Sequence, residues 1–255
     1  MRRSLIVLLA LVPAIPILAG VLLVGGTTSS GGARAPFSPA RAGTGLPPAG
    51  HASGIPAGPG ALVAVVARRT ALRDRPGGRS LAPLGPYTSF GSRQALWVVT
   101  RAGGWLGVLS PQLGNGRIGW IPPTAVRLFR DPWEVRVSLS ARSLSVLHAG
   151  HIVARYTVAV GRPDAPTPTG RFAVTDRLLT GDPSGPYGCC VMALSAVSPH
   201  AIQGWSGGNR IAIHSTTETS TIGEAVSHGC VRVTVAEGRW LLDHLPLGTP
   251  AVIGA

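Results

Sequence analysis

A histidine and a cysteine in the C-terminal half of the chain have the types and spacing of a base and a nucleophile. His214 ends an alternating apolar run, and Cys230 follows sixteen residues later in Ser-His-Gly-Cys. A free thiol has a pKa of about 8.5 and is mostly protonated at neutral pH, so attack by sulfur needs a base. An imidazole within hydrogen-bond reach can take that proton. The pair therefore predicts thiolate chemistry, with the backbone beside Gly229 open to a substrate and to a developing oxyanion.

Other interpretations exist for the same residues. A lone cysteine is most often a small buried hydrophobe, and a lone histidine is most often structural. His214, His228 and Cys230 also provide three candidate zinc ligands. Catalytic zinc sites of this kind typically contain a close Cys-x-x-Cys or His-x-x-x-His pair, which is absent here. We therefore expect no metal and no other cofactor.

Three separated sequence blocks resemble the L,D-transpeptidases of bacterial cell walls (YkuD type). The blocks are "PDAPTPTGRF", which contains Thr167, Pro168, Gly170 and Phe172, then "IHS", then "TIGEAVSHGCVRV". They occur in the order found in that family. The resemblance implies an L,D-transpeptidase-type β-sandwich with one or two short helices over residues 133–255.

The resemblance also implies a reaction. Cys230 would be the nucleophile, His214 its base, and the main-chain carbonyl of Ser215 the group that orients the imidazole. The thiolate would attack the amide between the third and fourth residues of a peptidoglycan stem peptide and release D-alanine. An amine of a neighbouring stem would then resolve the thioester and form a cross-link.

Four further residues receive roles from the same resemblance. His228 and Gly229 would help frame the oxyanion site, and Arg232 would hold the active-site loop or a substrate carboxylate. Tyr187 is the candidate for a tyrosine that assists the oxyanion hole in the family. Peptidoglycan stem peptides are thus the expected substrates.

Two other functions stay open at this point. An exported cysteine peptidase that hydrolyses wall peptides would use the same residue types, although those enzymes generally place the cysteine before the histidine. A non-catalytic cell-wall-binding protein would retain the fold without the reaction.

The elements around the motif predict an all-β class. Residues 135–139 and 152–160 alternate apolar and polar side chains, as strands with one buried face do. One helix is expected late in the chain, because Thr234 and Glu237 form a capping-box pattern ahead of Trp240 and Leu241. Strands and turns must therefore position the histidine and the cysteine.

Residues 61–130 show short apolar runs between turn signals, which predicts a second, smaller all-β domain. The runs are 62–67, 95–100, 105–109 and 118–121, with Asn115-Gly116 at a hairpin turn before the last. Segments such as "ALRDRPGG" and "GRIGWI" resemble the bacterial SH3-like domains that accompany cell-wall enzymes, which implies an SH3-like β-barrel. We expect Trp97, Trp105 and Trp120 in its core, because aromatic residues in strands are more often core than ligand shelf.

Charge and composition limit the partners. The formal net charge is +13, and the first acidic residue is Asp74. Such a balance favours anionic polymers or anionic membrane surfaces. Nucleic acid is not expected, because no dense basic stripe is interleaved with aromatic residues. The oligomeric state is not predicted.

The N-terminal part predicts export. Arg2 and Arg3 precede an uncharged apolar stretch over 5–24, so residues 1–26 have the pattern of a signal or membrane anchor. Residues 27–60 contain 14 Gly or Pro and no acidic residue, a composition that predicts a tether without a packed core. The folded part is therefore expected outside the cytoplasm, in the cell wall or at the outer face of the membrane.

The three cysteines do not predict a disulfide framework. Cys189 and Cys190 are neighbours, and adjacent cysteines bridge each other only with strain. We expect both to be packing residues in an apolar segment, with Cys230 as a free thiol.

Overall fold

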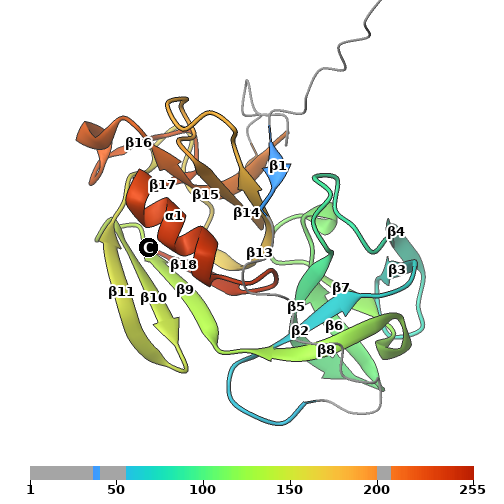
Figure 1. Ribbon diagram of the computed structural model, residues 1–255. Coiled ribbons are helices and arrows are strands. Elements are labelled where there is room, and N and C mark those ends of the chain that lie inside the picture. The colour runs from blue at the N-terminus through green and yellow to red at the C-terminus, as the bar shows by residue number, and fades with distance from the viewer. Residues whose placement is uncertain (1–36, 41–55, 200–207) are drawn as a thin grey trace, which may run out of the picture. The chain divides into compact units, whose positions relative to one another are not determined.

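The computed structural model describes residues 37–40, 56–199 and 208–255, and these form an all-β structure (Figure 1). The predicted anchor over 1–26 and most of the predicted tether over 27–60 lie outside the described residues. Within the described residues the one α-helix, α1, has ten residues, and no helix there meets the length and apolarity of a membrane span. The all-β prediction is confirmed.

The N-terminal sheet has seven antiparallel strands in the order β4-β3-β7-β6-β5-β2-β8. Their bounds are β2 Ala61–Val66, β3 Thr70–Arg73, β4 Ser80–Leu84, β5 Ala95–Ala102, β6 Trp105–Leu109, β7 Ile118–Ile121 and β8 Val126–Asp131, with short 3₁₀-helices η1 Pro111–Leu113 and η2 Pro123–Ala125. The predicted hairpin is present as the antiparallel pair β6 and β7. Its connection is longer than a two-residue turn because it contains η1.

Aliphatic side chains build the core of this sheet. Leu72, Leu96, Val108 and Ile121 are among its fully or almost fully buried members. The expectation that Trp97, Trp105 and Trp120 fill this core is wrong: all three are partly exposed and none belongs to the core cluster. The period-2 alternation explains the result, since Trp105 and Trp120 neighbour the inward-facing Leu106 and Ile121 and so point outward.

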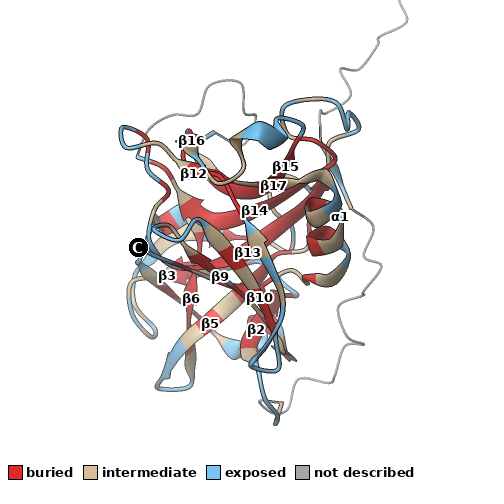
Figure 2. Cartoon of the chain, turned by 90° about the vertical axis from the view of Figure 1, so that its left-hand side faces the viewer, coloured by how far each residue is buried: buried red, intermediate tan, exposed pale blue. Residues whose placement is uncertain are grey.

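The C-terminal sheet has nine strands, in the order β11-β10-β9-β18-β13-β14-β15-β17, with β1 paired to β13. The bounds are β1 Ser38–Pro39, β9 Trp133–Ser138, β10 Ser143–His148, β11 His151–Thr157, β13 Gly170–Leu179, β14 Cys190–Val197, β15 Arg210–Thr216, β17 Val231–Thr234 and β18 Pro250–Gly254. Two short strands, β12 Val160–Gly161 and β16 Ala225–Ser227, pair in parallel beside it. Figure 2 shows that β13, β14 and β15 are buried over most of their length, which makes them the centre of the core.

The helix α1, Val235–His244, begins where the sequence predicts it. The Thr234 side chain accepts a hydrogen bond from Glu237 N, and the Glu237 carboxylate accepts one from Thr234 N. This reciprocal cap satisfies two backbone donors that a helix start otherwise leaves open. Leu241 and Leu242 are buried, and the helix packs against β14, β15 and β17. A third 3₁₀-helix, η3 Thr219–Thr221, precedes β16.

Part of the predicted tether belongs to the C-terminal sheet. Ser38 and Pro39 pair with Leu179 and Leu178 of β13, and Ala40 N donates to Arg177 O at 2.8 Å. The expectation that residues 27–60 contain no packed part is therefore wrong for residues 37–40. Composition misses this contact because β18 pairs only with residues 170–173 of β13, and the uncovered backbone beyond them can bond to almost any extended segment.

Asp131, where β8 passes to β9, gives a stability prediction. Its carboxylate accepts hydrogen bonds from Thr249 Oγ1 at 2.6 Å and Trp133 N at 2.9 Å, and it is 1% exposed. Burial raises the pKa of Asp131 to about 6 from 3.8, against the effect of these hydrogen bonds and of His148. A carboxyl whose pKa is raised by folding destabilises the folded state once it ionises. The free energy of unfolding therefore falls as the pH rises from about 4 to about 6.

We expect Asp131→Asn to raise the free energy of unfolding by about 1–3 kcal/mol at pH 8 and to change it little at pH 4. The oxygen of the new amide still accepts from Trp133 N, and its NH₂ group can donate to Thr249 Oγ1. The Thr249 hydroxyl then donates to Pro246 O, which lies 2.9 Å away. Urea unfolding at both pH values measures the difference. A variant that is less stable than the parent at pH 8 would contradict the assignment.

Candidate active site

Two parallel neighbouring strands carry the predicted histidine and cysteine. His214 lies in β15, opposite Arg232 of β17, and Cys230 immediately precedes β17. Ala212 and His214 share one face of β15, and Cys230 packs against Ala212. The sheet therefore brings the thiol and the imidazole to the same side of two adjacent strands.

The imidazole is oriented by the backbone. His214 Nδ1 donates to Ser215 O at 2.8 Å, which leaves Nε2 as the proton acceptor, and His214 is 3% exposed. Burial lowers the pKa of His214 to about 4, and the positive charge of Arg232 acts in the same direction, against the hydrogen bond to Ser215. The ring is therefore neutral, and able to accept a proton, from about pH 5 upward.

The thiol is also neutral at rest. Cys230 is 9% exposed and packs with Leu178, Val191 and Ala212. Burial raises the pKa of Cys230 to about 11, while a backbone hydrogen bond at Ala212 and the charge of Arg232 act in the opposite direction. A preformed thiolate–imidazolium pair is thus disfavoured, and proton transfer has to accompany attack on a substrate.

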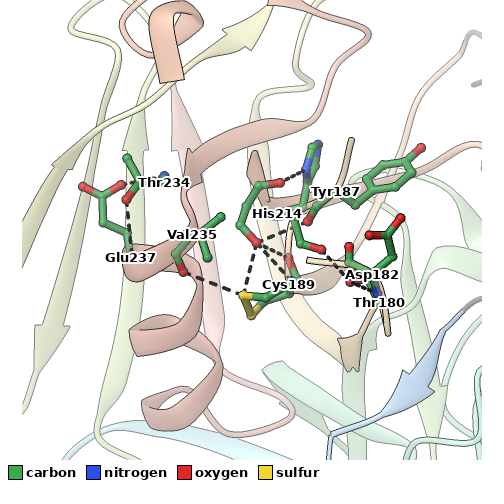
Figure 3. Close-up of a disulfide and its surroundings, with 11 residues drawn as sticks. Thr180, Asp182, Tyr187, Cys189, His214, Thr234, Val235 and Glu237 are labelled. Atoms are coloured by element: carbon green, nitrogen blue, oxygen red, sulfur yellow. Dashed lines mark hydrogen bonds between the residues drawn. A yellow bond between two sulfur atoms is a disulfide. The ribbon is translucent and has the colours of Figure 1, made fainter. Parts of the chain in front are cut away.

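Tyr187 contacts both groups. It lies in the connection between β13 and β14, and its ring is 4.9 Å from the ring of His214 in an edge-on arrangement (Figure 3). It also packs in the cluster that contains Cys230. Burial and the neighbouring Cys230 raise the pKa of Tyr187, so its hydroxyl stays protonated and can donate a hydrogen bond. This position suits the predicted oxyanion role.

The loop before Cys230 is held in shape by the hydroxyl of Ser227 and by a glycine, Gly229. Ser227 Oγ donates to Cys230 O at 2.6 Å and accepts from Gly229 N at 3.1 Å. Gly229 has φ +112, and a Cβ there would come within 2.9 Å of Ile211 Cδ1. Only glycine fits this left-handed, close-packed position without strain. The Thr167 block lies nearby: Thr167 Oγ1 accepts from Gly161 N at 2.8 Å, and a Gly229 Cβ would come 3.4 Å from Pro166 O.

The remaining predicted residues take different places. The Arg232 guanidinium forms an ion pair with Glu218 at 3.4 Å and sits beside His214 in register, where its charge lowers the pKa of both reacting groups. His228 is exposed, whereas Gly229 and Cys230 beside it are buried. The structure therefore brings together Cys230, His214, Ser215, Gly229, Arg232 and Tyr187, but leaves His228 at the rim.

Cys189 and Cys190 are buried in the core, as predicted for packing residues, but the expectation that they do not bridge each other is wrong, since they form a disulfide beside the site (Figure 3). Cys189 lies in the turn before β14 and Cys190 is the first residue of that strand, so their side chains do not alternate as in a regular strand. Ser215 Oγ accepts from Cys190 N at 3.0 Å and lies 3.2 Å from Tyr187 O. The hydroxyl of Ser215 thus joins the strand of His214 to the turn that carries Tyr187.

Two aromatic residues from outside the catalytic segment also reach the site, and sequence reasoning missed both. Phe37 and Phe90 pack in the Cys230 cluster, and the Phe37 ring lies 5.9 Å from the Tyr187 ring. Phe90 lies in the connection between β4 and β5 of the N-terminal sheet. No local pattern marks these residues, because their contacts join segments more than 100 residues apart.

Comparison with known proteins agrees with this geometry. Residues 132–253 match the L,D-transpeptidase catalytic domain (YkuD). This L,D-transpeptidase-like domain contains the whole constellation apart from Phe37 and Phe90.

Individual relatives carry the same name. The chain is 32% identical over 118 residues to L,D-transpeptidase YkuD of Bacillus licheniformis, covering 46% of this chain and 63% of that protein. It is 30% identical over 122 residues to YkuD of Bacillus subtilis strain 168, covering 48% and 66%. The chain thus spans somewhat less than two thirds of these relatives. A solved L,D-transpeptidase from Mycobacterium smegmatis aligns at 15% identity with a TM-score of 0.41, covering 75% of this chain and 99% of that one.

Proposed function

We propose that this chain is a peptidoglycan L,D-transpeptidase that works through a thioester on Cys230. The observation that carries the proposal is the placement of two groups around one tyrosine, His214 on β15 and Cys230 immediately before the parallel neighbour β17. Both lie in the segment that matches the L,D-transpeptidase catalytic domain. The names of the relatives support the reaction type, L,D-transpeptidation.

The first half-reaction forms the thioester. As Cys230 Sγ attacks the stem-peptide carbonyl carbon, its proton passes to His214 Nε2, and backbone N–H groups near Gly229 with the Tyr187 hydroxyl stabilise the oxyanion. The tetrahedral intermediate collapses with cleavage of the C–N bond. The imidazolium gives its proton to the leaving D-alanine amine, which restores the neutral imidazole.

The second half-reaction uses an amine of another stem peptide. His214 takes one proton from this amine as it attacks the thioester carbonyl, and the proton returns to the departing sulfur. A new amide and a free thiol result. Water in place of the amine would give hydrolysis, so product analysis separates a transpeptidase from a peptidase.

We also propose where the protein acts and how it is built. Export through residues 1–26, with a membrane tether, is supported by Arg2 and Arg3 ahead of an uncharged apolar stretch. An SH3-like identity of the seven-stranded sheet is supported by its small size and separate aliphatic core.

Intact mass after incubation with a tetrapeptide stem or a carbapenem tests the reaction. We expect a covalent adduct that maps to Cys230 and disappears in Cys230→Ala, whereas the Cys189→Ser, Cys190→Ser double variant keeps it. With tetrapeptide and an acceptor amine, the product should be a cross-linked dimer. An adduct on Cys230→Ala, or hydrolysis products alone, would overturn the proposal.

A further inference from the structure

The positive charge of this chain is segregated in the N-terminal sheet. Residues 61–130 contain ten arginines against one acidic residue, a formal charge of +9. Residues 133–255 contain nine arginines against eight acidic residues, a formal charge of +1. The proposed transpeptidase site lies in the nearly neutral part, so the reaction gives no reason for the charge on the other sheet.

Two tryptophans lie on the outer face of this charged sheet. Trp120 of β7 pairs with Gly107 of β6, and Trp105 is two residues before Gly107, so both indoles point to the same side. Their strand neighbours Leu106 and Ile121 point into the core. Gly107 itself has no side chain, but Thr100 and Ile118 fill the space over it, since a Cβ there would come within 2.5 Å of Thr100 Cγ2 and 2.9 Å of Ile118 Cγ2. The two indoles thus share one face of the β6–β7 hairpin.

Arginines adjoin the two indoles. Arg73 of β3 is in register with Trp120, and its guanidinium carbon lies 5.8 Å from the centre of the Trp105 ring. The hairpin after β3 adds Arg75 and Arg79, whose side chains are 75% and 79% exposed and which share a single carboxylate, Asp74, at 3.8 and 3.9 Å. One carboxylate cannot neutralise three guanidinium groups, so this edge of the face keeps a net positive charge.

Trp97, the third tryptophan of the sheet, contacts an arginine of the other sheet. The guanidinium of Arg171, from the L,D-transpeptidase-like domain, lies 5.8 Å from the Trp97 ring centre. The position of Trp97 outside the core of its own sheet is therefore explained by a contact with the other sheet. Trp105 and Trp120 instead meet a cation from their own sheet, Arg73, on its outward face.

We propose that the face formed by Arg73, Arg75, Arg79, Trp105 and Trp120 binds a phosphodiester-linked polymer of sugar or polyol units. Guanidinium groups donate two parallel hydrogen bonds to a phosphate, which an ammonium cannot match. The negative face of an indole attracts polarised C–H groups such as those of a sugar or polyol. Phosphates spaced by such units match a surface that offers both guanidinium groups and indoles. The site would hold the domain on an anionic polymer while Cys230 reacts elsewhere.

Binding of the full-length chain to poly(glycerol phosphate) bearing glucosyl groups tests this proposal. We expect the Kd to rise at least 10-fold in Trp105→Ser, in Trp120→Ser and in the double variant Arg75→Gln, Arg79→Gln. The arginine double variant should also lower the salt dependence of binding, by a slope of about one for each phosphate that the protein no longer neutralises. Arg75 and Arg79 are highly exposed, so the arginine double variant is expected to fold even if a tryptophan variant does not. Thermal unfolding shows whether each variant is folded.

Matched controls separate this face from net charge and from the reaction. Arg155→Gln, an exposed arginine of β11, should change the Kd less than 2-fold, and Cys230→Ala should not change it. Equal weakening by Arg155→Gln, binding of neutral dextran as tight as the phosphate polymer, or tighter binding of phosphatidylglycerol vesicles or duplex DNA would each overturn the proposal.

Discussion

Replacing His214 with glutamine is expected to slow acylation of Cys230 by about 10³- to 10⁴-fold at pH 7. With a thiol pKa of about 11, a fraction of only about 10⁻⁴ of the molecules carries the thiolate at that pH. Without the imidazole, attack depends on that fraction. The rate of His214→Gln should therefore rise about tenfold per pH unit up to about pH 11.

The parent protein should show a different pH dependence. Because the pKa of His214 is lowered to about 4, the neutral base is present from about pH 5, and acylation should stay nearly constant from pH 5 to pH 9. Single-turnover acylation by a carbapenem, followed by intact mass, measures both profiles. His151→Gln, an exposed histidine of β11, is the matched control and should behave like the parent. A His214→Gln rate within tenfold of the parent at pH 7 would contradict the role of the base.

The sequence predicted those parts of the site that depend on local pattern. Ile211 and Ile213 alternate into His214, and the capping box at Thr234 and Glu237 fixes the start of α1. Both signals lie within a few residues of the element that they define. The loop of Cys230 was marked by its glycine, which the structure explains by the positive φ of Gly229.

The parts that the sequence did not predict depend on contacts between distant segments. Burial raises the pKa of Cys230, and Phe37 and Phe90 pack against the cluster that buries this thiol. Tryptophans in strands are most often buried, which is why the sequence predicts Trp105 and Trp120 in the core. Their aliphatic neighbours Leu106 and Ile121 occupy the inward face instead, so both tryptophans face outward. The alternation of inward and outward positions along a strand therefore predicts the burial of a side chain better than its residue type does.

A buried ion pair between two central strands, β13 and β15, contributes to the stability of the fold. Asp176 of β13 is fully buried, and its carboxylate lies 3.6 Å from Arg210 Nη2 of β15, whose side chain is 11% exposed. Burial lowers the pKa of Arg210, and Asp176 opposes this shift. We expect Asp176→Asn to lower the free energy of unfolding by about 3–5 kcal/mol, because a buried guanidinium loses its counter-charge.

A second substitution separates the charge effect from a packing defect. Adding Arg210→Met to Asp176→Asn should recover at least half of the lost stability, since no unpaired charge is then buried. Glu134→Gln, which breaks the exposed pair with Arg136, is the control and should cost less than about 1 kcal/mol. Urea unfolding of the four proteins measures these values. A double variant less stable than Asp176→Asn alone would refute the explanation.

The same carboxylate also connects the two sheets at the active site. Asp176 accepts a hydrogen bond from Thr88 Oγ1, which in turn accepts from Phe90 N at 3.3 Å and Ser92 N at 3.2 Å. Phe90 is one of the side chains that pack against the Cys230 cluster. Weakening this connection should release Phe90 and uncover the thiol, so Thr88→Ala is expected to speed alkylation of Cys230 by iodoacetamide several-fold at pH 8. An unchanged alkylation rate in a folded Thr88→Ala protein would show that Phe90 does not depend on this hydrogen bond to shield the thiol.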